Sequence, residues 1–207
     1  MYDAVADEYC YAGTTILKNR LDLTNAEELD AFEAEVSDSR ADEELPAGDL
    51  DFQHFKAIHR HLFQDVYDWA GEVRNVRISK DGNMFCYPEN IAGEANKLFS
   101  QLRQDKFLKG LSSKDFATKS AQFLAYLNAI HAFREGNGRT QLSFFLLLAE
   151  HAGHPIDLDN GTRALVTVHP SYLLRLPDAE AKALEYRRFV EDLKMAADLL
   201  RRSARAA

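Results

Sequence analysis

The sequence predicts an all-α protein with one β-hairpin, built as a helical bundle around a central buried helix. Most of the 207 residues fall in segments whose apolar positions recur every three or four residues, the period of an amphipathic helix. Residues 140–151 are apolar on nearly all sides, which is typical of a helix at the centre of a core. The pair Asp81-Gly82 lies between two short β-prone segments and indicates a hairpin turn.

The first predicted helix follows a mixed N-terminal stretch. Residues 24–27 read Thr-Asn-Ala-Glu, a capping-box pattern that opens a helix through about Val36. Leu29 and Phe32 share one face of this helix with Val36. Residues 37–49 are acidic and contain a proline and a glycine, so we expect a solvated connection there.

The second predicted helix runs from Asp51 to about Val66, with apolar residues along one face. Three histidines in it could suggest a metal site. His59 and His61, however, are two positions apart and face different sides of a helix, unlike a ligand pair at i and i+4. We therefore interpret His54, His59 and His61 as structural residues.

The hairpin is predicted at residues 73–87. Residues 73–79 alternate partially between apolar and polar, and Met84–Tyr87 forms the second strand, which Pro88 ends. An isolated hairpin is marginally stable, so this one is expected to lie on the helical body.

Three helices are expected between the hairpin and residue 155. The first spans residues 91–107, and the third spans residues 140–151. The second is opened by the Ser112-x-x-Asp115 cap and ends at Ile130. Beyond them, Val166–His169 could be a short strand or a helical turn. A last helix is predicted from Asp178 to about Leu200.

Composition limits the class of protein. A hydrophobic content of 46% suffices for one well-cored domain, and a net charge of −8 argues against a general nucleic-acid binder. The N-terminus lacks the pattern of a secretory signal, and the longest apolar run, residues 144–149, is too short to span a bilayer. Cys10 and Cys86 suggest no disulfide framework. We expect a cytoplasmic protein without a membrane or direct nucleic-acid partner, or one exported without a classical signal peptide.

Residues 131–139, His-Ala-Phe-Arg-Glu-Gly-Asn-Gly-Arg, connect two predicted helices and combine groups suited to a phosphate ligand. The N-terminus of the following helix offers unpaired N–H groups and a positive dipole end. Gly136 and Gly138 permit close approach of the backbone to an anion. Arg139 adds a permanent positive charge.

Two other residues of this loop can carry chemistry. Glu135 is a hard oxygen ligand for Mg²⁺, and His131 has an unperturbed pKa suited to a general base. A Gly-Asn-Gly segment alone is often only a turn, and a lone histidine is usually structural. A turn requires none of His131, Glu135 and Arg139, and their combination favours a functional loop.

The loop resembles the signature of the Fic family, His-x-Phe-x-(Asp/Glu)-Gly-Asn-Gly-Arg-x-x-Arg. The matching residues are His131, Phe133, Glu135, Gly136, Asn137, Gly138 and Arg139. Leu142 stands where the signature has its second arginine. Residues 69–71, Arg74, Ile78–Lys80 and Phe85 resemble the family's flap beside the active site.

This resemblance implies a single Fic domain over residues 1–207, with a core of about 50–195 and an N-terminal helical segment of 1–45. It implies transfer of AMP from ATP and Mg²⁺ to a hydroxyl group of a target protein. His131 would be the general base and Glu135 the metal ligand. Nucleotide-binding residues would be Phe133, Gly136, Asn137, Gly138 and Arg139. The target would dock on the flap through Ile78, Lys80, Met84 and Phe85, as an added β-strand.

Leu142 leaves alternatives open, because the resemblance associates the missing arginine with the γ-phosphate. One is a transferase that uses another nucleotide or another diphosphate-containing donor. Another is a catalytically degenerate module that binds a partner. Family targets include topoisomerase subunits and small GTPases, and the sequence does not choose between them. The sequence contains no convincing copy of the family's inhibitory motif, so we expect inhibition by a separate small antitoxin or no inhibitor. The resemblance implies that the protein is either a bacterial toxin or an effector translocated into another cell.

Overall fold

The computed structural model describes residues 3–4, 7–80 and 83–156, and it divides into two compact units, Met1–Pro155 and Ile156–Ala207. All described helices and strands belong to the first unit. The predicted segments at Val166–His169 and from Asp178 onward lie outside the described residues. A single domain extending to residue 207 therefore stays a prediction.

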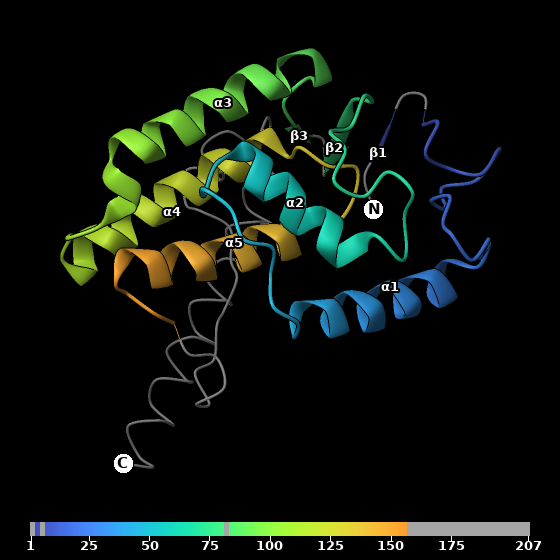
Figure 1. The fold of residues 1–207 in the computed structure, drawn as a ribbon. Helices are drawn as coiled ribbons and strands as arrows, with labels where there is room; N and C mark the ends of the chain where they lie inside the picture. The colour runs from blue at the N-terminus through green and yellow to red at the C-terminus, as the bar shows by residue number, and fades with distance from the viewer. Residues whose placement is uncertain (1–2, 5–6, 81–82, 157–207) are drawn as a thin grey trace, which may run out of the picture. The chain divides into compact units, whose positions relative to one another are not determined.

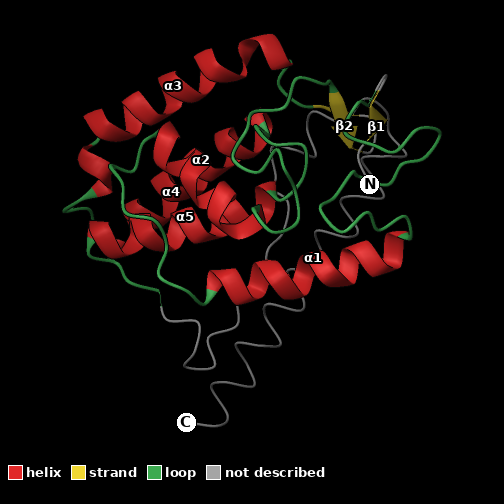
Figure 2. Ribbon diagram, turned by 45° about the vertical axis from the view of Figure 1, so that its right-hand side comes forward, coloured by secondary structure: helices red, strands yellow, loops and turns green. Residues whose placement is uncertain are grey.

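Five α-helices lie in the described part of the first unit and confirm the predicted helical bundle (Figure 1). They are α1 (Ala26–Ala41), α2 (Phe52–Phe63), α3 (Pro88–Gln104), α4 (Ser113–Ile130) and α5 (Asn137–Ala152). Helices α2, α4 and α5 occupy the middle, with α3 on one side and α1 on the other, as both views show (Figures 1 and 2). Helix α1 packs on α2, α2 on α5, α5 on α4, and α4 on α3. Within the described ranges no helix combines the length and apolar character needed to cross a bilayer.

The core lies between the middle helices and is rich in aromatic rings. Phe144 of α5 is fully buried and contacts Phe55, Phe99 and Phe123 with ring centroids 5.4–5.9 Å apart. The central position of α5 follows the sequence prediction, but its burial is not complete. Leu142 is 41% exposed, because it lies on the side of α5 that turns away from the aromatic core.

The predicted hairpin is present, with shorter strands. Strand β2 (Ile78–Lys80) pairs antiparallel with β3 (Asn83–Met84), Lys80 opposite Asn83; the predicted turn at 81–82 lies outside the described residues. A strand that was not predicted, β1 (Asp3–Ala4), pairs with the other edge of β2. A strand of two residues has no detectable period, so sequence patterning cannot find it. The sheet lies beside the helices (Figure 2).

Four helix boundaries, both ends of α1 and both ends of α3, differ from the predictions. Helix α1 is capped by Asn25 and not by Thr24, since the Asn25 side chain accepts hydrogen bonds from the N–H groups of Glu27 and Glu28. It continues to Ala41, into the stretch predicted as a connection. Helix α3 begins at Pro88, where a missing N–H costs no helical hydrogen bond, and ends at Gln104, before a short 3₁₀ turn at Lys106–Leu108.

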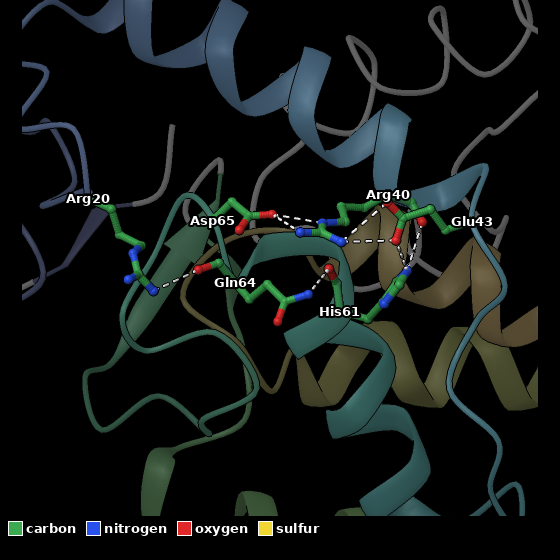
Figure 3. A network of polar contacts seen from close by, with 6 residues as sticks. All are labelled: Arg20, Arg40, Glu43, His61, Gln64 and Asp65. Atoms are coloured by element: carbon green, nitrogen blue, oxygen red, sulfur yellow. Dashed lines mark hydrogen bonds and ion pairs between the residues drawn. The ribbon is translucent and has the colours of Figure 1, made fainter.

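A polar network fastens the C-terminal end of α1 to that of α2 (Figure 3). Arg40 donates to Asp65 through Nε at 2.7 Å and pairs with it through a terminal nitrogen at 2.6 Å. His61 Nε2 lies 2.8 Å from the carbonyl oxygen of Arg40. Beyond it, Gln64 donates to the His61 carbonyl and accepts from Arg20 at its own carbonyl. This network holds α1 in place along the bundle.

Candidate active site

His131 lies where α4 ends, and its backbone adopts the left-handed conformation, with φ 50° and ψ 63°. This conformation is uncommon for a residue other than glycine and is found preferentially at functional sites. The His131 N–H donates to the Leu127 carbonyl at 3.1 Å and terminates the helix. The imidazole stacks on Phe85, which follows β3, with ring centroids 3.8 Å apart.

The environment of His131 keeps the imidazole neutral. Burial lowers its pKa to about 3, and the positive charges of Arg74 and Lys80 act in the same direction, against a hydrogen bond with Asn128. Nδ1 lies 3.2 Å from the Asn128 carbonyl oxygen, which can only accept a hydrogen bond. The proton of the neutral ring is therefore on Nδ1, and Nε2 is the nitrogen that can take up a proton.

The loop after His131 is closed by the side chain of Asn137. Its amide oxygen accepts from the Phe133 N–H at 3.0 Å, and its amide nitrogen donates to the Phe133 carbonyl at 2.8 Å. Phe133 is fully buried and stacks on His59 at 3.8 Å. These contacts explain why α5 begins at Asn137, three residues before the predicted start.

Gly136 and Gly138 have different reasons to be glycine. Gly136 has φ +77°, and an added Cβ would lie 2.4 Å from the Phe63 ring, so packing and backbone both require glycine there. Gly138 has neither constraint: an added Cβ would meet nothing within 4 Å. Gly138 thus leaves open space beside the first turn of α5, where the N–H groups lack helical acceptors.

The Glu135 side chain is held against its own loop, where its Oε1 accepts from the Gly136 N–H at 2.9 Å. Burial raises the pKa of Glu135, and the negative charge of Glu33 acts in the same direction, against the Gly136 hydrogen bond. A cation would relieve this unfavourable burial of charge. Among the described residues no group of three or more His, Cys, Asp or Glu side chains could hold a metal alone. One carboxylate together with substrate phosphates is a usual arrangement for Mg²⁺, and the residues present fit it.

Two arginines of the motif loop are paired with carboxylates from the N-terminal segment. Arg134 forms a buried ion pair with Asp7, through Nε at 2.8 Å and a terminal nitrogen at 2.6 Å. Arg139 donates to the Glu33 carboxylate and, at 2.5 Å, to Ser37 Oγ. The Arg139 side chain remains 34% exposed.

Residues that sequence reasoning did not select also shape the site. His59 is fully buried; its Nδ1 accepts from the Gly71 N–H at 2.8 Å, so its Nε2 donates to the Glu135 carbonyl at 3.0 Å. His54 and His61 bind other backbone groups, at Leu50 and Pro46 and at Arg40. The spacing of residues in α2 could not predict this contact of His59, because Glu135 lies 76 positions further along the chain.

The flap residues differ in exposure. Ile78 is fully buried on the central strand, and its carbonyl oxygen accepts from the Phe85 N–H at 3.2 Å, so its side chain is not available to another molecule. Lys80 is exposed, and Met84 is 51% exposed. In the sheet order β1-β2-β3, β3 is an outer strand. The structure thus brings the predicted loop and the predicted flap together at the contact between His131 and Phe85.

Comparison with known sequences identifies the family. A sequence model of the Fic/DOC family matches residues 49–149. The probable protein adenylyltransferase y4lH of Sinorhizobium fredii is 54% identical over 157 residues, which cover 75% of this chain and 82% of that protein. The probable protein adenylyltransferase Fic of Escherichia coli is 36% identical over 152 residues, covering 72% and 76%. The chain belongs to the Fic/DOC family.

Solved structures agree with this assignment. The Bartonella tribocorum effector BepC with bound AMPPNP is 29% identical, with a TM-score of 0.66, and the alignment covers 75% of this chain and 82% of that one. An N-terminal Fic domain from Bartonella quintana with bound ADP is also 29% identical, with a TM-score of 0.66, covering 75% and 81%. The predicted Fic fold is thereby confirmed.

Proposed function

We propose that this protein is an adenylyltransferase that transfers AMP from ATP to a hydroxyl side chain of a target protein, with His131 as the general base. One observation carries the proposal. A neutral imidazole, oriented by the hydrogen bond from its Nδ1, lies at the start of a loop, and that loop leads into the N-terminus of a helix with open space beside Gly138. A base and an anion-binding site lie on one short segment. Relatives named as protein adenylyltransferases support this reading.

The reaction follows from these positions. The target hydroxyl oxygen attacks the α-phosphorus, the bond to the pyrophosphate oxygen breaks, and pyrophosphate leaves. The hydroxyl proton passes to Nε2 of His131, and no covalent intermediate with the enzyme forms. Such chemistry depends mainly on positioning and charge neutralisation.

The remaining motif residues bind and orient the nucleotide in this proposal. The first-turn N–H groups of α5, at Asn137, Gly138 and Arg139, face the phosphates, and Arg139 adds positive charge. Glu135 would hold Mg²⁺, which when bound neutralises phosphate charge. Phe133 and Gly136 fix the loop that presents these groups.

The target is proposed to dock on the flap. The outer strand β3 offers main-chain groups for an added strand, and Met84 offers exposed apolar surface. The relative VbhT of Bartonella schoenbuchensis, 36% identical over 80% of this chain but only 35% of its own length, is likewise named a protein adenylyltransferase. A topoisomerase subunit or small GTPase as target, and a small antitoxin as inhibitor in trans, remain part of the proposal.

A second donor class deserves a test because of Leu142. This exposed leucine occupies the motif position of an arginine, and the guanidinium of Arg139 is already bound to Glu33. Residue 142 therefore supplies no positive charge for distal phosphates, which favours a donor with a smaller charge, such as another diphosphate-containing compound.

The experiment is a labelling assay with ATP carrying ³²P at either the α or the γ position, Mg²⁺, and bacterial protein extract. Adenylyl transfer predicts protein labelling from the α position only. Labelling from the γ position would show a kinase. If ATP labels nothing while a panel of other labelled nucleotides and diphosphate donors does, the second donor class is correct.

A further inference from the structure

Arg74 lies in the loop between α2 and β2 and is 1% exposed. All four side-chain hydrogen bonds recorded for it among the described residues go to backbone carbonyl oxygens. Burial lowers the pKa of Arg74 to about 10, far above neutral pH, so the guanidinium is a buried cation. Burying a charge in this way is costly, and a packing role alone would not require it.

One set of these bonds reaches the motif. Arg74 Nε donates to the His131 carbonyl at 2.8 Å, and a terminal nitrogen donates to the Ile130 carbonyl at 3.3 Å. The backbone N–H of Arg74 donates to the Ala132 carbonyl at 3.0 Å. Three consecutive carbonyls around the left-handed His131 are therefore held by one residue. Two of them belong to the negative end of the α4 dipole, which suits a cation.

The other set reaches both ends of the flap. Arg74 donates to the Val76 carbonyl at 2.7 Å, just before β2, and to the Cys86 carbonyl at 2.6 Å, just after β3. The Cys86 N–H in turn donates to the Ala129 carbonyl of α4 at 3.1 Å. Phe85, beside Cys86, is the residue that stacks on His131. The base of the flap and the backbone of His131 thus share one guanidinium.

We infer that Arg74 is a positioning residue that couples the flap to His131, holding the imidazole against Phe85 and in line with a target bound on the flap. Its planar fork binds carbonyls in several directions at once, which a lysine ammonium at the same place cannot do. The coupling itself concerns only the structure of the flap and of His131. Its consequence for catalysis rests on the proposed function.

The test compares Arg74→Lys with Arg77→Lys, a matched control in the same loop whose side chain is 52% exposed. The readout is the NMR chemical shift of the His131 ring protons, because the stacked Phe85 ring changes this shift. The Phe85→Leu protein gives the chemical shift in the absence of that ring. We expect Arg74→Lys to move the His131 signals toward the Phe85→Leu position and Arg77→Lys to leave them unchanged. Unchanged signals in a folded Arg74→Lys protein would overturn the inference.

A second measurement covers the case in which Arg74→Lys does not fold. In the unmodified protein, the Arg74 side-chain N–H protons should exchange slowly with solvent and show nuclear Overhauser effects to the backbone around residues 86 and 131. Rapid exchange without such effects would overturn the inference.

Activity then separates this inference from the proposed function. With a labelled target in hand, misplacement of the base predicts a fall in kcat of about 100-fold in Arg74→Lys, with ATP affinity within about twofold. A parallel loss of ATP affinity would indicate a general structural role and would contradict the inference. Absence of any AMP transfer by the unmodified protein would refute the proposed function alone, since the NMR result stands independently.

Discussion

Glu33 of α1 binds the guanidinium of Arg139, the last residue of the motif loop, across 106 positions of sequence. The same carboxylate accepts a hydrogen bond from the Tyr67 hydroxyl, and only 10% of the Glu33 side chain is exposed. Arg139 also lies over the Phe63 ring, 4.8 Å from its centroid. Helix α1, which lies before the matched residues 49–149, therefore contributes a charged partner to the motif loop.

The substitution Glu33→Gln tests this pair. It leaves Arg139 and the Tyr67 hydroxyl without a charged acceptor, and we expect the free energy of unfolding to fall by about 1–3 kcal/mol. Urea denaturation measures it. Glu35→Gln, exposed on the same helix, is the control and should change stability by less than about 0.5 kcal/mol. Equal effects of the two substitutions would show that the pair contributes nothing.

The two motif glycines should respond oppositely to alanine. Gly136→Ala forces a Cβ into the Phe63 ring at positive φ and should lower thermal stability markedly. Gly138→Ala meets no protein atom and should leave thermal stability nearly unchanged, while its methyl group fills space proposed for a phosphate. We expect nucleotide affinity, measured by calorimetry, to fall in a stable Gly138→Ala protein. Unaltered affinity would place the nucleotide elsewhere.

Restoring the missing arginine should strengthen triphosphate binding. In Leu142→Arg, one added charged contact predicts tighter ATP binding by about 1.5–3 kcal/mol, roughly 10- to 150-fold in Kd. AMP, which lacks the distal phosphates, should bind with unchanged affinity, and Leu142→Met serves as the uncharged control. A gain for AMP equal to that for ATP would contradict a distal-phosphate site beside residue 142.

Two buried histidines predict a particular loss of stability in acid. Burial lowers the pKa values of His59 and His131 to about 3, against 6.5 for an unperturbed histidine. Because the folded pKa is lowered, this stabilisation is present above pH 6.5 and is lost as the pH falls toward 3, at about 1.4 kcal/mol per pH unit for each group.

Denaturation at about pH 7 and about pH 5 measures this dependence. The His131→Asn protein should lose roughly 2 kcal/mol less than the unmodified protein over that interval, since it lacks one of the two groups. An identical loss in both proteins would mean that His131 titrates in the folded state near its usual pKa.

The sequence was most informative where the determinants are local. The Ser112 cap of α4 and its end at Ile130 were predicted correctly, and so was the hairpin, because capping and periodicity involve neighbouring residues. The start of α5 was placed three residues late, because it depends on the Asn137 side chain closing the loop onto Phe133. Side-chain bridges of this kind have no periodic pattern.

The residues that sequence reasoning missed have distant partners. On α1, Leu29 was placed on the buried face correctly, but Glu33 and Ser37 accompany it there in place of Phe32 and Val36, which are only half-buried. Glu33 and Ser37 lie at helical spacing from Leu29, but the sequence does not show that Arg139 is their partner. His59 likewise binds a carbonyl whose position only the tertiary fold reveals. Arg74 was selected as part of the flap, but the carbonyl groups that it binds were not predicted.

The most direct test of the central claim separates nucleotide binding from transfer at His131. In His131→Ala, ATP binding measured by calorimetry should be retained, because the proposed phosphate-binding groups belong to α5, while labelling of protein from α-³²P-ATP should be lost. His151→Ala, an exposed histidine at the far end of the same helix, should keep both. Undiminished labelling by the His131→Ala protein would contradict the role of His131 as general base, and with it the proposed reaction.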